Sequence, residues 1–405
     1  MGSIYLTNIT GQNRPGLLEA LCSSLQEHPI EILDVSQAVI HASLSLSLLL
    51  HFTDPAQSKP VLKELLYQAH NLGLDLEFSC IDPEDYQSWS SSAERKTYIL
   101  TLLGRSLNTE HLYRIASLVR ENQLDIAQIE RLSNRRPLSR KQQEQGLTCI
   151  EMELSGNPSD LGRMRSEFLA LSRRYPVDIG LQEDTPYRRH RRLIAFDMDS
   201  TLIQSEVIDE LAYQAGAGPR VQEITRRAMQ GELDFKQSLQ ERVALLQGLE
   251  ASVLERVAQG LTLTQGAQRL IQNLKTLGYK IAILSGGFTY FGRYLQDMLG
   301  IDYLFANDLE LQGNILTGRI QGEMVDGQKK AELLQQLARQ ENISLEQVIA
   351  VGDGANDLPM LNLAGLGIAF HAKPMVRQGA KQAISNVGLD AVLYFLGLKD
   401  KEAIA

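Results

Sequence analysis

The chain has 405 residues, enough for two or three domains, with 43% hydrophobic and 22% charged residues, an ordinary globular composition. Its net charge of −9 at pH 7 argues against a general nucleic-acid-binding surface, which needs an excess of basic residues. Three widely spaced cysteines, Cys22, Cys80 and Cys149, lack paired metal-binding spacing and indicate reduced thiols in a cytoplasmic protein. The first residues have no signal-peptide pattern, and the apolar segment from Ala42 is too short to span a bilayer, so we expect no membrane insertion.

Two stretches of the N-terminal half, residues 4–35 and 98–130, have the same pattern. Each starts with an apolar strand that runs into a glycine, Gly11 or Gly104, and continues with an amphipathic helix and a second apolar strand. Each is then followed by a third strand, a second helix and a final strand. This β-α-β-β-α-β order predicts two ferredoxin-like modules in tandem.

The first module carries the segment "TGQNRPG", residues 10–16. Gly11 and Gly16 permit a tight turn from strand to helix, and the exposed backbone N–H groups there are a candidate site for the carboxylate of a small effector. The alternative is that the glycines only build the turn. The segment resembles the ACT domain, a ligand-sensing module of amino-acid enzymes, although Asn13 stands where that family usually has an acidic residue. The second module lacks the Arg-Pro-Gly, which favours packing or dimerisation as its role.

Two basic stretches separate the predicted elements. Residues 134–141, "NRRPLSRK", lie between two strands and predict a solvated loop. Residues 187–192, "YRRHRR", lack interleaved aromatic residues and favour an inter-domain linker over a nucleic-acid patch. We therefore place a boundary near residue 185, and expect three domains, at 1–84, 95–184 and 185–405.

From residue 191 strands alternate with helices, which predicts an α/β domain with a Rossmann-like, doubly wound parallel sheet. Three apolar strands, "RLIAF", "YKIAIL" and "VIAVG", end in the polar segments "DMDST", "SGG" and "GDGAND". Ligands of such sheets bind at the carboxyl ends of the strands, so we expect these three tips to line one pocket.

The polar segments supply a cluster of carboxylates. Asp197 and Asp199 share a direction because side chains alternate along a strand, and Asp353 and Asp357 follow another strand. A site of carboxylates without cysteine or histidine suits Mg²⁺, which would relieve their repulsion. An ionised aspartate beside an electrophile is the arrangement that forms an aspartyl-phosphate.

A phosphoryl group also needs positive partners. Ser285 with the backbone N–H groups of Gly286 and Gly287 can supply some of them, and Lys329 or Lys330, at the start of a predicted helix, can supply the rest.

Together these motifs, over residues 191–400, resemble the haloacid dehalogenase superfamily of phosphohydrolases. The resemblance implies that Asp197 is the nucleophile and Asp199 the general acid and base. It also implies that Mg²⁺ is held by Asp197, Asp353 and the backbone carbonyl of Asp199, with support from Asp357. Ser285 and Lys330 would hold the phosphate; the family's register favours Lys330, and Lys329 is the alternative.

The segment at about 207–270 is largely helical by pattern and predicts a cap that closes over the pocket. Glu206 and Arg242 are oppositely charged and match the ammonium and the carboxylate of an amino acid. The alternative is that both are ordinary surface charges.

Four longer stretches, "FDMDSTLIQSEVIDELA", "MQGELDFKQSLQERVALLQGL", "AILSGGFTYF" and "GDGANDLPML", are similar to the phosphoserine phosphatase family. This resemblance implies that Glu206 and Arg242 bind the serine moiety. The remaining substrate contacts that it implies are Met229 and Phe235 in the cap, and Ser285, Gly286 and Asn356 at the phosphoryl end.

The implied activity is Mg²⁺-dependent hydrolysis of O-phospho-L-serine to L-serine and phosphate, the final step of L-serine biosynthesis. Two alternatives stay open: a related phosphatase for another small phosphate ester or a phosphoprotein, and a non-enzymatic amino-acid sensor. Unpaired edges of ferredoxin-like sheets commonly associate, so we expect a homodimer. The sequence leaves the effector and the resting position of the cap undetermined.

Overall fold

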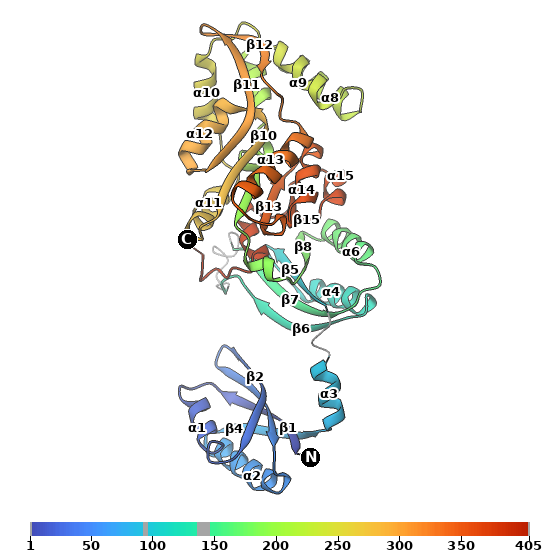
Figure 1. Cartoon of the computed structure of the whole chain (residues 1–405), viewed down its shortest axis with the longest axis vertical. Helices are drawn as coiled ribbons and strands as arrows, with labels where there is room; N and C mark the ends of the chain where they lie inside the picture. Colours follow the sequence, from blue (N-terminus) through green and yellow to red (C-terminus); the bar gives the residue numbers. More distant parts are fainter. Residues whose placement is uncertain (1, 92–95, 136–145, 404–405) are drawn as a thin grey trace. The chain divides into compact units, whose positions relative to one another are not determined.

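The computed structural model describes residues 2–91, 96–135 and 146–403, which form two compact units, residues 1–95 and 96–405. The first unit is a four-stranded antiparallel sheet in the order β2-β3-β1-β4, with α1 and α2 packed on one face (Figure 1). Its elements are β1 (Ser3–Gln12), α1 (Leu17–Ser23), β2 (Ile30–Ile40), β3 (Ser43–Phe52), α2 (Pro55–Asn71), β4 (Leu74–Ile81) and, after the sheet, α3 (Pro83–Ser91).

Alternation of side chains explains this sheet. In β3, Leu44, Leu46, Leu48 and Leu50 all point to the helices and are almost fully buried, whereas the serines between them face the other side. The helix α2 begins where Asp54 accepts a hydrogen bond from the backbone N–H of Ala56, at 3.0 Å, with a proline in the first turn.

The second unit begins with a similar sheet in the order β6-β7-β5-β8. Its elements are β5 (Thr97–Gly104), α4 (Thr109–Glu121), β6 (Leu124–Arg131), β7 (Thr148–Gly156), α6 (Leu161–Arg174) and β8 (Val177–Glu183). The predicted β-α-β-β-α-β order is therefore confirmed in both N-terminal modules. The basic stretch 134–141 lies mostly outside the described residues.

The remainder of this unit surrounds a seven-stranded sheet in the order β12-β11-β10-β9-β13-β14-β15. All neighbouring strands are parallel except β11 and β12, an antiparallel pair that the sequence pattern did not reveal. The strands are β9 (Leu193–Phe196), β10 (Lys280–Phe288), β11 (Tyr303–Gln312), β12 (Ile315–Gln321), β13 (Val348–Gly352), β14 (Leu366–Phe370) and β15 (Gln382–Ile384). The prediction of a doubly wound α/β sheet behind two ferredoxin-like modules is confirmed.

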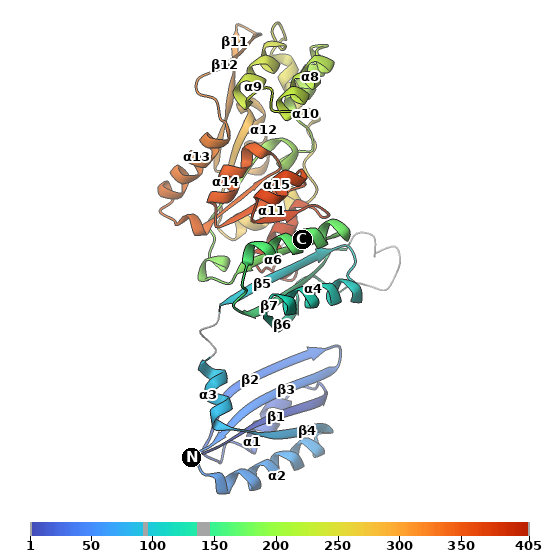
Figure 2. The same cartoon turned by 90° about the vertical axis from the view of Figure 1, so that its right-hand side faces the viewer.

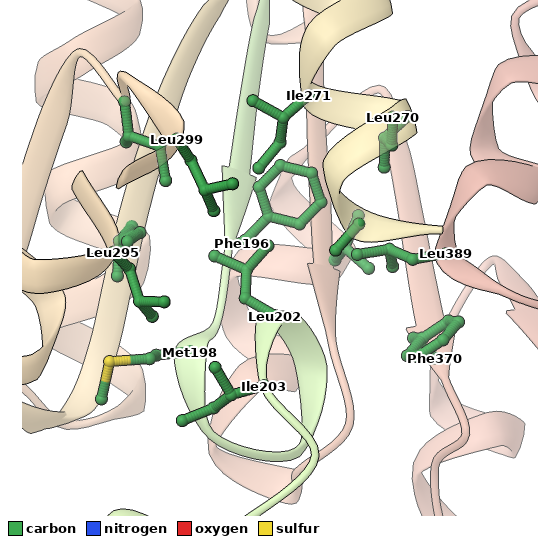
Figure 3. Packing of buried hydrophobic residues seen from close by; sticks show 14 of the residues in the cluster. Phe196, Met198, Leu202, Ile203, Leu270, Ile271, Leu295, Leu299, Phe370 and Leu389 are labelled. Atoms are coloured by element: carbon green, nitrogen blue, oxygen red, sulfur yellow. The ribbon is translucent and has the colours of Figure 1, made fainter. Parts of the chain in front are cut away.

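Helices cover both faces of this sheet (Figure 2). On one face lie α11 (Ala267–Thr276), α12 (Thr289–Leu299) and α16 (Val392–Phe395), and on the other α13 (Gly327–Gln340), α14 (Leu358–Leu363) and α15 (Pro374–Gly379). Residues of β9 alternate between the two cores, so Phe196 packs with Ile271 of α11 (Figure 3) while Ala195 faces α13 and α14. This double burial explains why β9 reads as a continuous apolar run.

Between β9 and β10 the chain forms a helical segment. It consists of α7 (Val207–Gln214), α8 (Gly218–Met229), α9 (Phe235–Ala244) and α10 (Ser252–Gly260). Among the described residues, none of the helices has the length and apolar character needed to cross a lipid bilayer.

The second ferredoxin-like sheet packs directly against the seven-stranded domain. Asp178 of β8 accepts hydrogen bonds from the backbone N–H groups of Ser385 and Asn386, both at 2.9 Å. Arg188, which is almost fully buried, forms an ion pair with Glu151 of β7. The stretch 187–192 is therefore more than the linker expected from its composition: Arg188 and also Arg191 are buried where the two sheets meet. Arg191 donates there to the backbone carbonyl of Arg188 and to Gln182 Oε1.

Candidate active site

The carboxyl ends of β9, β10 and β13 open into a cleft of about 970 Å³. One wall comes from the strand tips and the other from the helical segment α7–α9. Of the residues singled out from the sequence, the lining includes Asp197, Asp199, Glu206, Phe235, Arg242, Ser285, Gly286, Asp353 and Asn356. The fold thus brings into one cleft side chains that are up to 159 positions apart along the chain, Asp197 and Asn356.

A sharp turn after β9 presents the first two aspartates. Asp197 ends the strand, and its Oδ1 accepts a hydrogen bond from the backbone N–H of Met198 at 2.8 Å. Three residues after Asp197, Ser200 has φ 56° and ψ 5°, the left-handed region that a residue with a side chain rarely adopts. The strained turn, η3 (Met198–Leu202), lets Asp199 reach the cleft directly behind Asp197.

Three carboxylates converge at the cleft floor. Asp197, Asp353 and Asp357 each place an oxygen within 4.8 Å of the other two. Burial and the neighbouring charges of Asp197 and Asp357 raise the pKa of Asp353 to about 8, and burial with Asp197 raises the pKa of Asp357 to about 6. Such mutual repulsion is what a divalent cation relieves, and an all-oxygen donor set fits a hard cation.

A buried lysine joins this cluster. The Nζ of Lys330 lies 2.8 Å from Asp197 Oδ1 and 2.7 Å from Asp357 Oδ1, and the lysine is fully buried. Burial alone disfavours the ammonium, but the charges of both aspartates raise the pKa of Lys330, which keeps it protonated. Lys329 points elsewhere and pairs with Glu323 at 2.6 Å, so of the two lysines left open by the sequence, Lys330 is the one beside the carboxylates.

Asp199 is held in a different environment. Its Oδ1 accepts a hydrogen bond from the backbone N–H of Val207 at 3.0 Å, and its Oδ2 lies against Gly287, where a β-carbon would come within 2.4 Å of it. Burial, then the charges of Glu206 and Asp197, raise the pKa of Asp199 well above the usual range. A raised pKa favours the protonated form of this carboxyl group.

The tip of β10 differs in one detail from the sequence-based expectation. The backbone N–H of Gly287 donates to Ser285 Oγ at 2.9 Å, so it is not directed into the cleft as a free donor. Ser285 is fully buried, and the carbonyl of Gly286 accepts from Asn307 Nδ2 at 2.8 Å.

The helical wall of the cleft carries one acidic and one basic side chain, Glu206 and Arg242. Glu206 accepts a hydrogen bond from Ser200 Oγ at 2.8 Å, and desolvation by the cleft walls raises its pKa although its end remains open to the cleft. Arg242 of α9 is partly buried, and its Nε donates to the carbonyl of Ser238 at 3.3 Å. Burial lowers the pKa of Arg242, while the charges of Glu206 and Asp209 partly offset this effect.

The remaining predicted residues have varied positions. Phe235, at the start of α9, lies over Gly286, where a β-carbon would come within 2.7 Å of the ring. The side chain of Met229 lies outside what the structure describes. Gly11 belongs to the end of β1 rather than to a turn, and Asn13 and Gly16 are exposed, with Gly16 at φ 84° directly before α1.

Three residues at the cleft escaped the sequence reasoning. Asn307 bridges the carbonyl of Gly286 and the backbone N–H of Val325, at 2.8 Å each, and so ties the β10 tip to the approach of α13. Lys236 and Asp326 form an ion pair at 2.9 Å between α9 and the start of α13. These residues lie in no recognisable motif, and only the meeting of distant segments reveals them.

Comparison with known proteins agrees with this geometry. Residues 191–365 match the family model described as haloacid dehalogenase-like hydrolase, and residues 3–79 match that of the ACT domain. The fold and the aspartate cluster thus define a haloacid dehalogenase-like hydrolase preceded by an ACT domain. A phosphoserine phosphatase of Streptomyces coelicolor is 40% identical, covering 99% of this chain and 93% of its own length, and phosphoserine phosphatase SerB2 of Mycobacterium tuberculosis is 37% identical, covering 97% and 93%. This chain belongs to the phosphoserine phosphatase family.

Solved structures show the same architecture. A probable phosphoserine phosphatase from Vibrio cholerae, without ligand, superposes with a TM-score of 0.57 at 36% identity, over 74% of this chain and 86% of that one. A haloacid dehalogenase family hydrolase from Salmonella enterica gives 0.63 at 31% identity, over 75% and 99%.

Proposed function

We propose that this chain hydrolyses O-phospho-L-serine to L-serine and phosphate through an aspartyl-phosphate on Asp197. One observation carries the proposal: a cleft whose floor holds Asp197 beside Asp199, a buried carboxyl group with a raised pKa, and whose helical wall holds Glu206 and Arg242. The floor suits phosphoryl transfer, and the wall suits an amino acid that carries both charges. The relatives named phosphoserine phosphatase over nearly the full chain support the same reaction.

In the first half-reaction an oxygen of Asp197 attacks the phosphorus. The bond between phosphorus and the serine oxygen breaks, its electron pair leaves with that oxygen, and Asp199 donates its proton to it. The raised pKa of Asp199 supports this role, since the group must be protonated before the substrate reacts. Lys330, next to Asp197, balances charge on the phosphoryl oxygens, and the hydroxyl of Ser285 holds one of them.

In the second half-reaction Asp199, now ionised, takes a proton from a water molecule. The hydroxide oxygen attacks the phosphorus, the bond to Asp197 breaks, and phosphate leaves with Asp197 restored as a carboxylate. The hydrogen bond from the backbone N–H of Val207 keeps Asp199 aimed at this position through both steps.

The cation proposed for this site is Mg²⁺. Asp197 and Asp353 would hold it together with the backbone carbonyl of Asp199, and Asp357 would support them. When bound it neutralises the clustered carboxylates and the charge of the phosphoryl group. A readout independent of activity is thermal unfolding: Mg²⁺ should raise the melting temperature of the wild type, and this rise should be lost in Asp353→Asn.

Specificity for the amino acid rests on the helical wall. Glu206 is proposed to pair with the substrate ammonium and Arg242 with its carboxylate, while Phe235 closes the apolar side. Asn356 and Gly286 would contact the phosphoryl end, and Met229 of α8 would complete the cap. The segment at about 207–270, which contains α7–α10, is proposed as the cap within a catalytic domain at 185–405.

The test compares phosphoserine with p-nitrophenyl phosphate, which has a phosphate but lacks the ammonium and the carboxylate of the amino acid. Arg242→Ala should raise KM for phosphoserine roughly 10- to 100-fold, the loss expected for a charge-assisted pair, and leave the aryl phosphate nearly unchanged. Arg256→Ala, an exposed arginine on α10, is the matched control. Asp197→Asn should abolish both activities. Equal effects of Arg242→Ala on both substrates would instead favour the alternative, a phosphatase for other small esters or phosphoproteins.

For the N-terminal modules, at 1–84 and 95–184, we propose dimerisation and amino-acid sensing in a homodimer. The match to the ACT domain and the exposed turn with Asn13 and Gly16 support this role. We also propose that the protein acts in the cytoplasm, a reducing compartment in which its cysteines Cys22, Cys80 and Cys149 would stay free. Light scattering of the full chain, with and without L-serine, tests the assembly; a monomer at assay concentration would contradict it.

A further inference from the structure

A second cavity lies between the second ferredoxin-like sheet and the seven-stranded domain. Its volume is about 570 Å³, and it is formed by α6 and β8 on one side and by the α15–β15 segment on the other. It is separate from the catalytic cleft, because the two share no lining residue. A cavity of this size accommodates a small molecule.

The charge of this cavity is one-sided. Within the described part of the chain, four cationic side chains line it and no aspartate or glutamate does: Arg165 and Arg173 of α6, and Arg377 and Lys381 of the opposite wall. None of the four has a carboxylate within ion-pair distance anywhere in residues 2–91, 96–135 and 146–403. Clustered cations that lack counter-ions repel one another and lower the stability of the fold.

Burial further destabilises this cluster of four cations, because it removes water from their charged groups. The Nε atoms of Arg165 and Arg377 are both buried and have no hydrogen-bond partner among the residues that the structure describes. Burial lowers the pKa of Arg165, and burial with the charges of Arg165 and Arg191 lowers the pKa of Lys381; Glu183 and Glu346 offset these effects only from a distance. Arg377 keeps one bond, from Nη1 to Ser385 Oγ at 3.3 Å, and Lys381 one, to the carbonyl of Ala364 at 2.8 Å. Neither of these neutral acceptors supplies the negative charge that the cavity lacks.

We propose that this interdomain cavity is a binding site for a small anion with two or more negative charges, a phosphate or a dicarboxylate, held between Arg165 on α6 and Arg377 and Lys381 on the opposite wall. Guanidinium groups bind such anions in forked pairs. The apolar remainder of the lining, Phe168, Leu169, Ile179 and Leu181, accommodates a short carbon skeleton.

The position of the site couples it to catalysis. Met375 and Val376 line the catalytic cleft, and the next residues of the same segment, from Arg377 to Ala383, line this cavity. An anion that fixes this segment against α6 therefore restrains a wall of the active site. By linkage, substrate affinity should differ between the anion-bound and the free enzyme.

The experiment measures the melting temperature of the full-length enzyme against added inorganic phosphate or succinate, with ionic strength held constant by sodium chloride. The wild type should show a saturable rise beyond that of chloride. In the double variant Arg165→Gln/Arg377→Gln the apparent Kd for succinate should weaken at least tenfold, and phosphate should retain only its binding in the catalytic cleft. The control, Arg174→Gln/Arg339→Gln, removes two exposed arginines of α6 and α13 and should behave like the wild type.

Equal affinities in all three proteins, or no saturable rise in the wild type, would overturn the proposal. A response to phosphate alone that the double variant weakens would assign the site to phosphate compounds, and a response to succinate alone would assign it to dicarboxylates. A response to phosphate alone that is equal in all three proteins belongs to the catalytic cleft and would overturn the proposal. Without anion the double variant should melt no lower than the wild type, since it loses unpaired charges; the single variant Arg165→Gln repeats the comparison independently. Phosphoserine hydrolysis by the single variant Arg165→Gln, measured without added anion, should stay within about threefold of the wild type. If the anion-binding proposal fails, the proposed phosphatase reaction is therefore unaffected.

Discussion

The side-chain amide of Gln382 pairs with the backbone of Leu181 in the manner of a neighbouring strand. The backbone N–H of Leu181 donates to Gln382 Oε1 at 2.9 Å, and Gln382 Nε2 donates to the Leu181 carbonyl. Since β8 is the edge of its sheet, this single side chain satisfies two backbone groups that would otherwise be buried without partners.

Gln382→Ala should therefore destabilise the contact between the second ferredoxin-like sheet and the seven-stranded domain. Two buried backbone groups lose their partners, so the free energy of unfolding should fall by about 1–3 kcal/mol. Urea unfolding measures it, with exposed Gln222→Ala as control. If both variants unfold at the same urea concentration, water has replaced the side-chain amide and the Gln382–Leu181 pairing contributes no net free energy of unfolding.

Lys330→Met should separate the two neighbouring lysines. Because Lys330 lies between Asp197 and Asp357, its loss leaves buried carboxylates uncompensated and should lower the free energy of unfolding by about 3–5 kcal/mol in metal-free buffer. Phosphoserine hydrolysis should fall roughly 100- to 1,000-fold.

The matched change Lys329→Met removes only pairs with the exposed Glu323 and Glu332 and should change little in either measurement. If Lys329→Met proves as damaging as Lys330→Met, the assignment of the phosphate-binding lysine is wrong.

Gly287→Ala should damage catalysis more than stability. A β-carbon there would come within 2.4 Å of Asp199 Oδ2 and so displace the proposed acid and base. Moving a catalytic group by about 1 Å costs about 100-fold in rate, so we expect kcat to fall by about that factor. Gly260→Ala, at the end of α10 where a β-carbon meets no atom within 4 Å, should leave kcat unchanged. Wild-type turnover in Gly287→Ala would show that Asp199 does not need this position.

Cys149 should resist thiol reagents in the folded protein. It is fully buried, and burial, then the charges of Glu151 and Asp400, raise its pKa well above 9.0. Exposed Cys80 should react first with an alkylating reagent at pH 8, and Cys149 only after unfolding. Peptide mapping of the labelled protein distinguishes the three cysteines, and rapid labelling of native Cys149 would contradict the buried position.

The same pKa shift predicts a dependence of stability on pH. In the unfolded chain Cys149 ionises near pH 9, whereas the folded protein keeps it neutral, so the unfolded state is stabilised and the free energy of unfolding falls as the pH rises above 9. The advantage of the wild type over Cys149→Ala in urea unfolding should thus be full at pH 8 and smaller at pH 10. An advantage that grows between these values would reverse the sign of the shift.

The sequence by itself determined the features that are local along the chain. The repeated β-α-β-β-α-β order follows from the period of apolar residues, and the polar segment after the apolar strand β9 places Asp197 at the sheet edge. The expected strand alternation does not extend to Asp199, because β9 ends at Phe196 and the turn η3 brings Asp199 to the cleft. Asp353 and Ser285 could be brought to the same cleft because parallel strands present their carboxyl ends at one edge.

Only the tertiary structure decided which distant groups meet. The choice of Lys330 over Lys329 depends on which side of α13 faces β9, and the bridge made by Asn307 depends on where β11 passes the β10 tip. The burial of Arg188 and the cationic cavity lined by Arg165 both arise where the second ferredoxin-like sheet packs against the seven-stranded domain. No periodic pattern records such docking, because it depends on the packing of surfaces whose residues are remote in sequence.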